Sequence, residues 1–272
     1  MKYISLPILF FVLTFQSCQQ NTQVRQHAAL DSVASPSIDS SSQGLAVGDK
    51  PSATNLSPSI FMIDTYRIFE GMEDPSKILD ENWLDLYEEN GHYHLAPIDY
   101  KIEDGYNECA EVETKTVVSK RNSILFLNFP FLKSGEVDHL KIIQAEVWPG
   151  ESVIYNFNSQ KYQLKGYGDI TSTQVQTNDK GHEEIFHDVK NYKLTYSHNE
   201  STEANMLQVE QFNDTFIKTL FVGDIDRDGK LDFIISDPTD YEENSIRLIL
   251  SSQINNNDIE KSSFQQNVQF DC

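Results

Sequence analysis

Five residues in one short stretch have the types and the spacing of a calcium site. Four aspartates occupy positions 1, 3, 5 and 9 of a loop that begins at residue 224, and Gly229 at position 6 allows a sharp turn. Ca²⁺ takes about six to eight oxygen ligands, which a chain that curls around the ion can supply. Without an ion, four carboxylates this close would repel one another. The predicted ligands are Asp224, Asp226, Asp228, the backbone carbonyl of Lys230, and Asp232.

The segment after the loop separates this site from an EF-hand. An EF-hand needs an acidic ligand at position 12, where this chain has Ile235, the end of an apolar run suited to a buried strand. A loop that closes at position 9 and leads directly into a strand resembles the calcium loops of the FG-GAP/VCBS family. Arg227 stands where that family commonly has a small residue, but the position supplies no ligand. The resemblance covers the loop and its flanks, and it implies a retained Ca²⁺ site.

The aspartate loop occurs only once in the sequence, and this affects the expected fold. In the FG-GAP/VCBS family such loops often repeat around a β-propeller, but the nearest other segments, 166–170 and 178–181, lack the aspartate series. A single copy argues against a full propeller, whose blades need about 40–50 residues each. We expect a structural ion, because protein oxygens fill its coordination sphere. The alternative is a solvated acidic turn between two strands.

The first residues have the pattern of a bacterial export signal. Lys2 precedes an apolar stretch from Ile4 to Phe15, which is too short to span a membrane as a helix. Ser17 followed by Cys18 resembles a lipoprotein cleavage site, although Phe15 and Gln16 depart from the commonest form. The resemblance implies that residues 1–17 are removed and that Cys18 carries lipid. The domain would then be anchored to the cell envelope, where calcium is abundant; ordinary secretion with a free Cys18 thiol is the alternative.

The three cysteines fit the same compartment. If Cys18 carries lipid, Cys109 and Cys272 remain as an even pair in an oxidising environment. We expect a disulfide between them, and the alternative is two unpaired thiols.

The composition of the rest of the chain predicts a tether followed by a domain, and its charge argues against some classes of partner. The net charge is −21, which opposes binding to nucleic acid or to anionic lipid. Nine serines, three prolines and no aromatic residue lie between Asp31 and Ile60, so we expect a disordered tether over 18–58. Packed residues begin near Ser59, which predicts one domain over 59–272.

The sequence predicts mostly β-structure in that domain. Alternating apolar residues recur in many short segments, and the run from Ile124 to Phe129 suits a strand buried on both faces. One helix is expected over 76–89, with Ser76 as its cap and Trp83 on its buried side. The pattern predicts an antiparallel sandwich, a barrel or a partial propeller, and does not distinguish them.

Other sequences that suggest chemistry are weaker. His92 and His94 have zinc-compatible spacing on a strand, but no third ligand is evident, so a pair of surface histidines is preferred. The segment from His182 to His187 has one residue too many for a metalloprotease signature. No nucleophile elbow, phosphate loop or dinucleotide fingerprint occurs.

The sequence therefore favours a non-enzymatic, calcium-binding envelope lipoprotein that binds a protein or glycan partner or has a structural role. A hydrolase acting on extracellular polymer is the alternative, since a fold can bring distant carboxylates together. A cavity lined by two carboxylates away from the calcium loop would favour that alternative.

Overall fold

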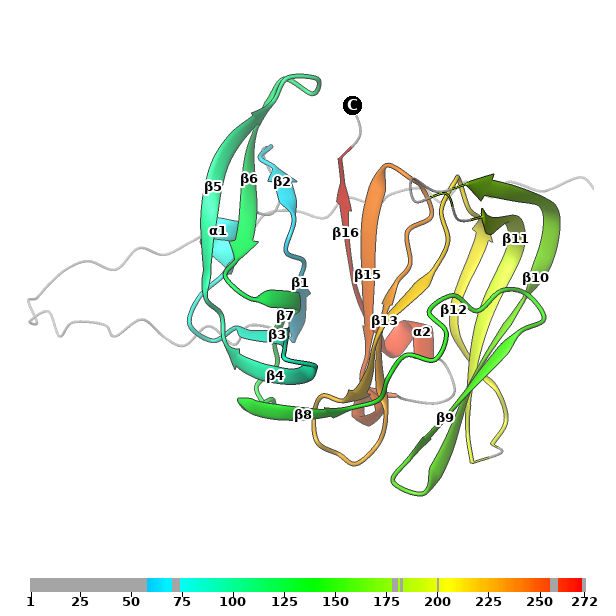
Figure 1. Ribbon diagram of the computed structural model, residues 1–272. Helices are drawn as coiled ribbons and strands as arrows, with labels where there is room; N and C mark the ends of the chain where they lie inside the picture. The colour runs from blue at the N-terminus through cyan, green and yellow to red at the C-terminus, as the bar shows by residue number, and fades with distance from the viewer. Residues whose placement is uncertain are drawn as a thin grey trace, which may run out of the picture. The chain divides into compact units, whose positions relative to one another are not determined.

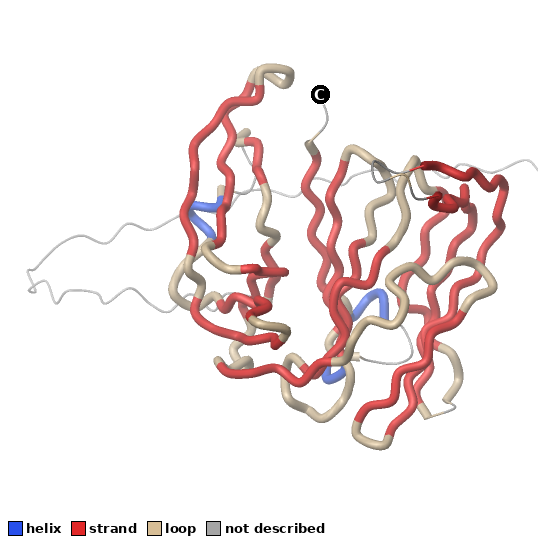
Figure 2. Tube along the Cα trace, in the orientation of Figure 1, coloured by secondary structure: helices blue, strands red, loops and turns tan. Residues whose placement is uncertain are grey.

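The computed structural model describes residues 58–69, 74–177, 181, 183–199, 201–254 and 259–270. They belong to a compact unit that runs from Ala53 to Cys272. The predicted signal peptide, Cys18 and the tether up to residue 57 lie outside the described residues. No helix among the described residues has the length and apolar character needed to cross a membrane. Strands dominate the unit and helices are few and short, which confirms the predicted fold class (Figure 2).

The main sheet has nine antiparallel strands, in the order β1-β7-β3-β4-β8-β13-β14-β15-β16 (Figure 1). Their bounds are β1 Ser59–Phe61, β7 Asn122–Asn128, β3 Leu84–Glu89, β4 His92–Pro97, β8 Gly135–His139, β13 Lys218–Asp224, β14 Asp232–Ser236, β15 Glu243–Ile249 and β16 Phe264–Gln269. The two outer strands approach each other: the Met62 amide, just after β1, donates to Gln266 Oε1 of β16 at 2.6 Å. The sheet therefore nearly closes into a barrel-like form, one of the three predicted architectures.

Two smaller sheets and three short helices complete the described structure. One sheet has the order β12 Ala204–Gln211, β11 Glu183–His198, β10 Gln160–Thr177 and β9 Ser152–Phe157, and the other has the order β2 Thr65–Arg67, β6 Val112–Ser119 and β5 Tyr100–Asn107. The helices are α1 Pro75–Ile78, η1 Ser251–Gln253 and α2 Ile259–Ser262. All strand pairs within the three sheets are antiparallel.

Strand β14 separates two apolar cores. Ile234 packs among the residues enclosed by the nine-stranded sheet, whereas Phe233 and Ile235 pack against the four-stranded sheet. All three side chains are at most 1 % exposed. The prediction that the aspartate loop leads into a buried strand is therefore confirmed, and the loop is held at the junction of the two cores.

The predicted extent of the helix is wrong. Helix α1 covers only Pro75–Ile78, with Asp74 as its cap, and residues 84–89 form β3 instead. Strand β3 pairs with both β7 and β4, and Leu86 is completely buried between them. Long-range pairing therefore overrides the local helical spacing, as often happens with short apolar patterns. Trp83 is buried as predicted, although from a turn and not from a helix.

A buried ion pair lies where β14, β15 and β16 meet. Arg247 Nε is 2.7 Å from Asp237 Oδ2, and the two side chains are 9 % and 3 % exposed. Ser245 donates its hydroxyl to the other oxygen of Asp237, and Gln265 also donates to this carboxylate. Arg247 donates further to Gln265 and Ser263. Both charges are thus compensated inside the protein.

Candidate metal centre

The aspartate loop is the connection of the β13–β14 hairpin. Asp224 is the last residue of β13 and Asp232 is the first residue of β14, and the pairing closes with Gly223 opposite Asp232. The two ends of the loop are therefore fixed by the sheet, while the residues between them turn back over the hairpin end. Positions 1 and 9 of the sequence pattern are brought next to each other by strand pairing.

Three of the four predicted carboxylates converge. Oxygens of Asp224, Asp226 and Asp232 all lie within 4.8 Å of one another. Asp228 lies beside them and receives hydrogen bonds from the Lys230 amide at 2.8 Å and the Ser251 hydroxyl at 3.1 Å. The role of the Lys230 backbone carbonyl as a ligand stays a prediction.

Backbone amides fold the loop around the Asp224 carboxylate. The amides of Asp228 and Gly229 donate to its two oxygens, at 3.0 and 2.9 Å. Arg227 and Gly229 both adopt left-handed backbone angles, with φ of 61° and 85°. The glycine adopts its angle without steric penalty, as the sequence pattern predicts.

Without a cation, burying this cluster of carboxylates destabilises the folded protein. Asp232 is completely buried, and burial together with the nearby charge of Asp226 raises its pKa well above the usual range. Burial also raises the pKa of Asp224, and the charges of Asp228 and Asp226 add to the effect. Among the described residues, no lysine or arginine forms an ion pair with Asp224, Asp226 or Asp232. A hard dication would supply the missing charge, and oxygen ligands are what Ca²⁺ prefers, so the residues present fit the ion.

The loop is tied to three other segments. The Asn158 side chain, from the turn between β9 and β10, donates to the Gly229 carbonyl at 3.1 Å. The Ser251 amide of η1 donates to Asp232 Oδ1 at 2.8 Å. Arg227 Nη2 donates to the carbonyls of Ser134 and Glu136, where β8 begins. Sequence reasoning missed Asn158 and Ser251, which lie far from the loop in the chain and form no recognisable motif with it.

Among the described residues, neither histidine considered for zinc belongs to a group of three potential metal ligands. His92 Nδ1 lies 3.0 Å from Glu136 Oε1, and the His94 ring packs against Tyr87. Within the described part of the chain, the converging aspartates are the only group of three potential metal ligands. His187 lies in strand β11, which agrees with rejecting a metalloprotease helix there; His182 lies outside the described residues.

The cysteine predictions are tested only at Cys109. Cys109 is disulfide-bonded, whereas Cys272, its predicted partner, lies outside the described residues. The pairing itself stays a prediction, as does lipidation at Cys18.

The described cavities bear on the hydrolase alternative. One cavity, of about 770 Å³, has a single carboxylate, Glu88, in its lining. A cavity of about 630 Å³ beside Trp148 also has one, Glu146. Two carboxylates, Asp188 and Asp214, line a third cavity of about 270 Å³.

Comparison of the chain with protein-family models, with curated proteins and with solved structures finds no match.

Proposed function

We propose that this chain is a calcium-stabilised, β-rich domain in which Ca²⁺ bound at residues 224–232 serves as a structural clamp. The observation that carries the proposal is the convergence of Asp224, Asp226 and Asp232 within 4.8 Å, two of them buried and none paired with a cationic side chain of the described structure. Asp228 and the Lys230 carbonyl complete the proposed ligand set. Ca²⁺ would neutralise the charge that folding concentrates there.

The contacts of the loop support a structural role. It connects two central strands and also binds the β9–β10 turn, η1 and the start of β8. An ion that fixes the loop would hold these segments together where the two apolar cores meet. The proposed domain is non-enzymatic, and a protein or glycan ligand would bind elsewhere on its surface.

Thermal melting tests the clamp. At a free Ca²⁺ concentration about 100-fold above the dissociation constant, binding should stabilise the folded state by about 2.7 kcal/mol. For a domain of this size, that corresponds to a rise in melting temperature of about 5–10 °C. The measurement compares melting curves in calcium and after removal of the ion with a chelator.

Asp226→Asn is the informative variant, because Asp226 is only partly buried and its replacement keeps the side-chain volume. We expect it to lose most of the calcium response. Asp104→Asn, an exposed aspartate on β5, is the matched control and should respond like the unmodified protein. Equal calcium responses of the two variants, or none in the unmodified chain, would refute the clamp.

The effect of calcium should depend on pH. In calcium-free protein, the folded-state pKa values of Asp224 and Asp232 are raised, so these groups favour folding below the unfolded pKa of about 3.9, and that stability is lost as pH rises through their folded pKa. Ca²⁺ binds the ionised carboxylates and so stabilises more as pH rises. The melting temperatures with and without calcium should therefore differ most at neutral pH and converge toward about pH 4. A difference that is constant across this range would contradict the assignment.

The proposed setting is the bacterial cell envelope. Cleavage before Cys18 would leave a lipid anchor, with residues 18–58 as the tether, and abundant external calcium would load the loop. A Cys109–Cys272 disulfide suits that oxidising compartment. The composition of the N-terminal segment and the cysteine count support this proposal.

A further inference from the structure

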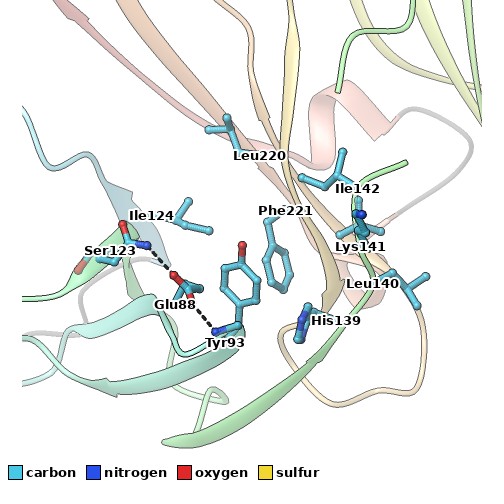
Figure 3. A pocket seen from close by; sticks show the side chains of 13 residues that line it. Glu88, Tyr93, Ser123, Ile124, His139, Leu140, Lys141, Ile142, Leu220 and Phe221 are labelled. Carbon is cyan, nitrogen blue, oxygen red and sulfur yellow. Dashed lines mark hydrogen bonds between the residues drawn. The ribbon is translucent and has the colours of Figure 1, made fainter. Parts of the chain in front are cut away.

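One cavity of the described structure has no residue of the aspartate loop in its lining. It has a volume of about 770 Å³ and is bounded by residues of β3, β4, β7, β8 and β13 together with the segment after β8. Figure 3 shows Glu88 and Ile124 on one side of it and Lys141 and Ile142 on the other, with Tyr93 and Phe221 between them. The volume lies in the range of cavities that hold small organic ligands.

Aliphatic and aromatic side chains form most of the cavity wall. They are Tyr93, Ile124, Leu140, Ile142, Leu220, Phe221 and Val222. Phe221 is almost completely buried in the main core, while Ile124 and Leu220 pack against that core and keep part of their surface open. An apolar body in the cavity would cover this open surface and so gain from the removal of water.

A fixed negative charge stands at one side. Both oxygens of Glu88 accept hydrogen bonds, one from the Gly91 amide and one from the Asn122 side chain at 2.8 Å. These hydrogen bonds lower the pKa of Glu88, so the carboxylate is ionised at neutral pH. Each oxygen retains capacity to accept a further bond from a cationic group.

A positive charge stands at the other side. Lys141 is exposed and forms no ion pair with any described residue. Its ammonium group is therefore available to an anionic group in the cavity. The two opposite charges lie on opposite sides of an apolar space, an arrangement that neither solubility nor core packing requires.

Tyr93 supplies a third polar group. Its ring packs edge-on against His139 at 4.8 Å and Phe221 at 5.0 Å between centroids, which fixes its direction. The hydroxyl points into the space between the two sides in Figure 3. Among the described residues it has no hydrogen-bond partner, so it can serve a ligand.

We propose that this cavity binds a small molecule with an apolar body, a cationic group held by Glu88 and an anionic group held by Lys141. Short apolar peptides have that chemistry, with one charge at each end of the molecule, whereas a free amino acid carries both charges on one carbon and cannot reach both sides of the cavity. The Tyr93 hydroxyl would contact the polar atoms between the two charged ends. The proposal does not depend on calcium binding.

Calorimetric titration of the full chain with four probes tests the charge requirement. Phenylalanine and the dipeptide leucyl-phenylalanine carry both charges, phenethylamine carries only the cation, and 3-phenylpropionate carries only the anion. We expect the dipeptide to bind about tenfold more tightly than either singly charged probe, because it gains a second charge-assisted contact. Phenylalanine carries both charges on one carbon and should bind no more tightly than the singly charged probes.

Two variants cross-check the roles of the charges. Glu88→Gln should weaken the binding of the dipeptide and of phenethylamine but not that of 3-phenylpropionate. Lys141→Met should weaken the binding of the dipeptide and of 3-phenylpropionate but not that of phenethylamine. Glu89→Gln, an exposed neighbour that does not line the cavity, is the control and should change nothing. Superimposable melting curves would confirm that all three variants fold.

The proposal is overturned if the dipeptide does not bind, or if phenylalanine or a singly charged probe binds as tightly as the dipeptide. It is also overturned if Glu88→Gln and Lys141→Met fail to show the crossed pattern. The comparison of probes uses the unmodified protein, so it remains decisive even if a variant does not fold.

Discussion

Replacing Asp232 with alanine should destabilise the calcium-loaded protein more than any other substitution in the loop. Its carboxylate accepts hydrogen bonds from the amides of Ile225 and Ser251, at 2.7 and 2.8 Å, and is itself completely buried. Each buried amide left without a partner costs about 1–3 kcal/mol, so the loss should be roughly 2–6 kcal/mol before calcium is considered. Chemical denaturation in saturating calcium measures it.

The same substitution should behave differently without calcium. Asp232 is then a buried carboxylate near two others, and removing it relieves both desolvation and repulsion. We therefore expect a smaller loss in the calcium-free protein. Asp232→Asn, which keeps one acceptor and removes the charge, should lose less than alanine in both conditions and should also lose the response to calcium. An alanine penalty that is the same with and without calcium would contradict a bound ion at this carboxylate.

Replacing Arg247 with leucine should be the most damaging change away from the loop. It would leave Asp237 buried without its cation, and breaking a buried pair from one side costs about 3–5 kcal/mol. Burial already raises the pKa of Asp237 despite the arginine, so the variant should recover some stability at acidic pH as the carboxyl group takes up a proton. Chemical denaturation of the variant at neutral and acidic pH measures both effects.

Two further variants serve as controls for Arg247. Lys218→Leu removes one partner of an exposed pair, in which Lys218 Nζ lies 3.7 Å from Glu146 Oε1, and should change stability by less than about 1 kcal/mol. The double variant Arg247→Leu/Asp237→Leu removes both buried charges and should be more stable than Arg247→Leu alone. If Arg247→Leu cost no more than Lys218→Leu, the buried pair would not have the role assigned to it.

The local part of the candidate metal centre could be predicted from the sequence. Three features depend only on residues close in the chain: the spacing of the aspartates, the left-handed turn at Gly229 and the apolar strand that follows at Phe233–Ile235. The β13–β14 hairpin contains all three. What anchors the loop could not be predicted. Asn158 and Ser251 reach it through pairings of distant strands, which leave no pattern in a single sequence.

The same distinction explains the fold. Alternation predicts many strands, but closure of the main sheet depends on contacts such as that between Met62 and Gln266, which are 204 positions apart. The helix expected over 76–89 fails for a related reason. Its apolar spacing fits a helix as well as a strand, and only pairing with β4 and β7 decides between them.

Calorimetric titration with Ca²⁺ tests the central proposal most directly. The unmodified chain, freed of metal, should bind one ion per molecule at this loop, and Asp232→Asn should abolish that binding while Asp104→Asn leaves it intact. Mg²⁺, which demands a smaller and more regular octahedral site, should bind much more weakly. A chain that binds no Ca²⁺, or that binds it equally well after Asp232→Asn, would contradict the proposal.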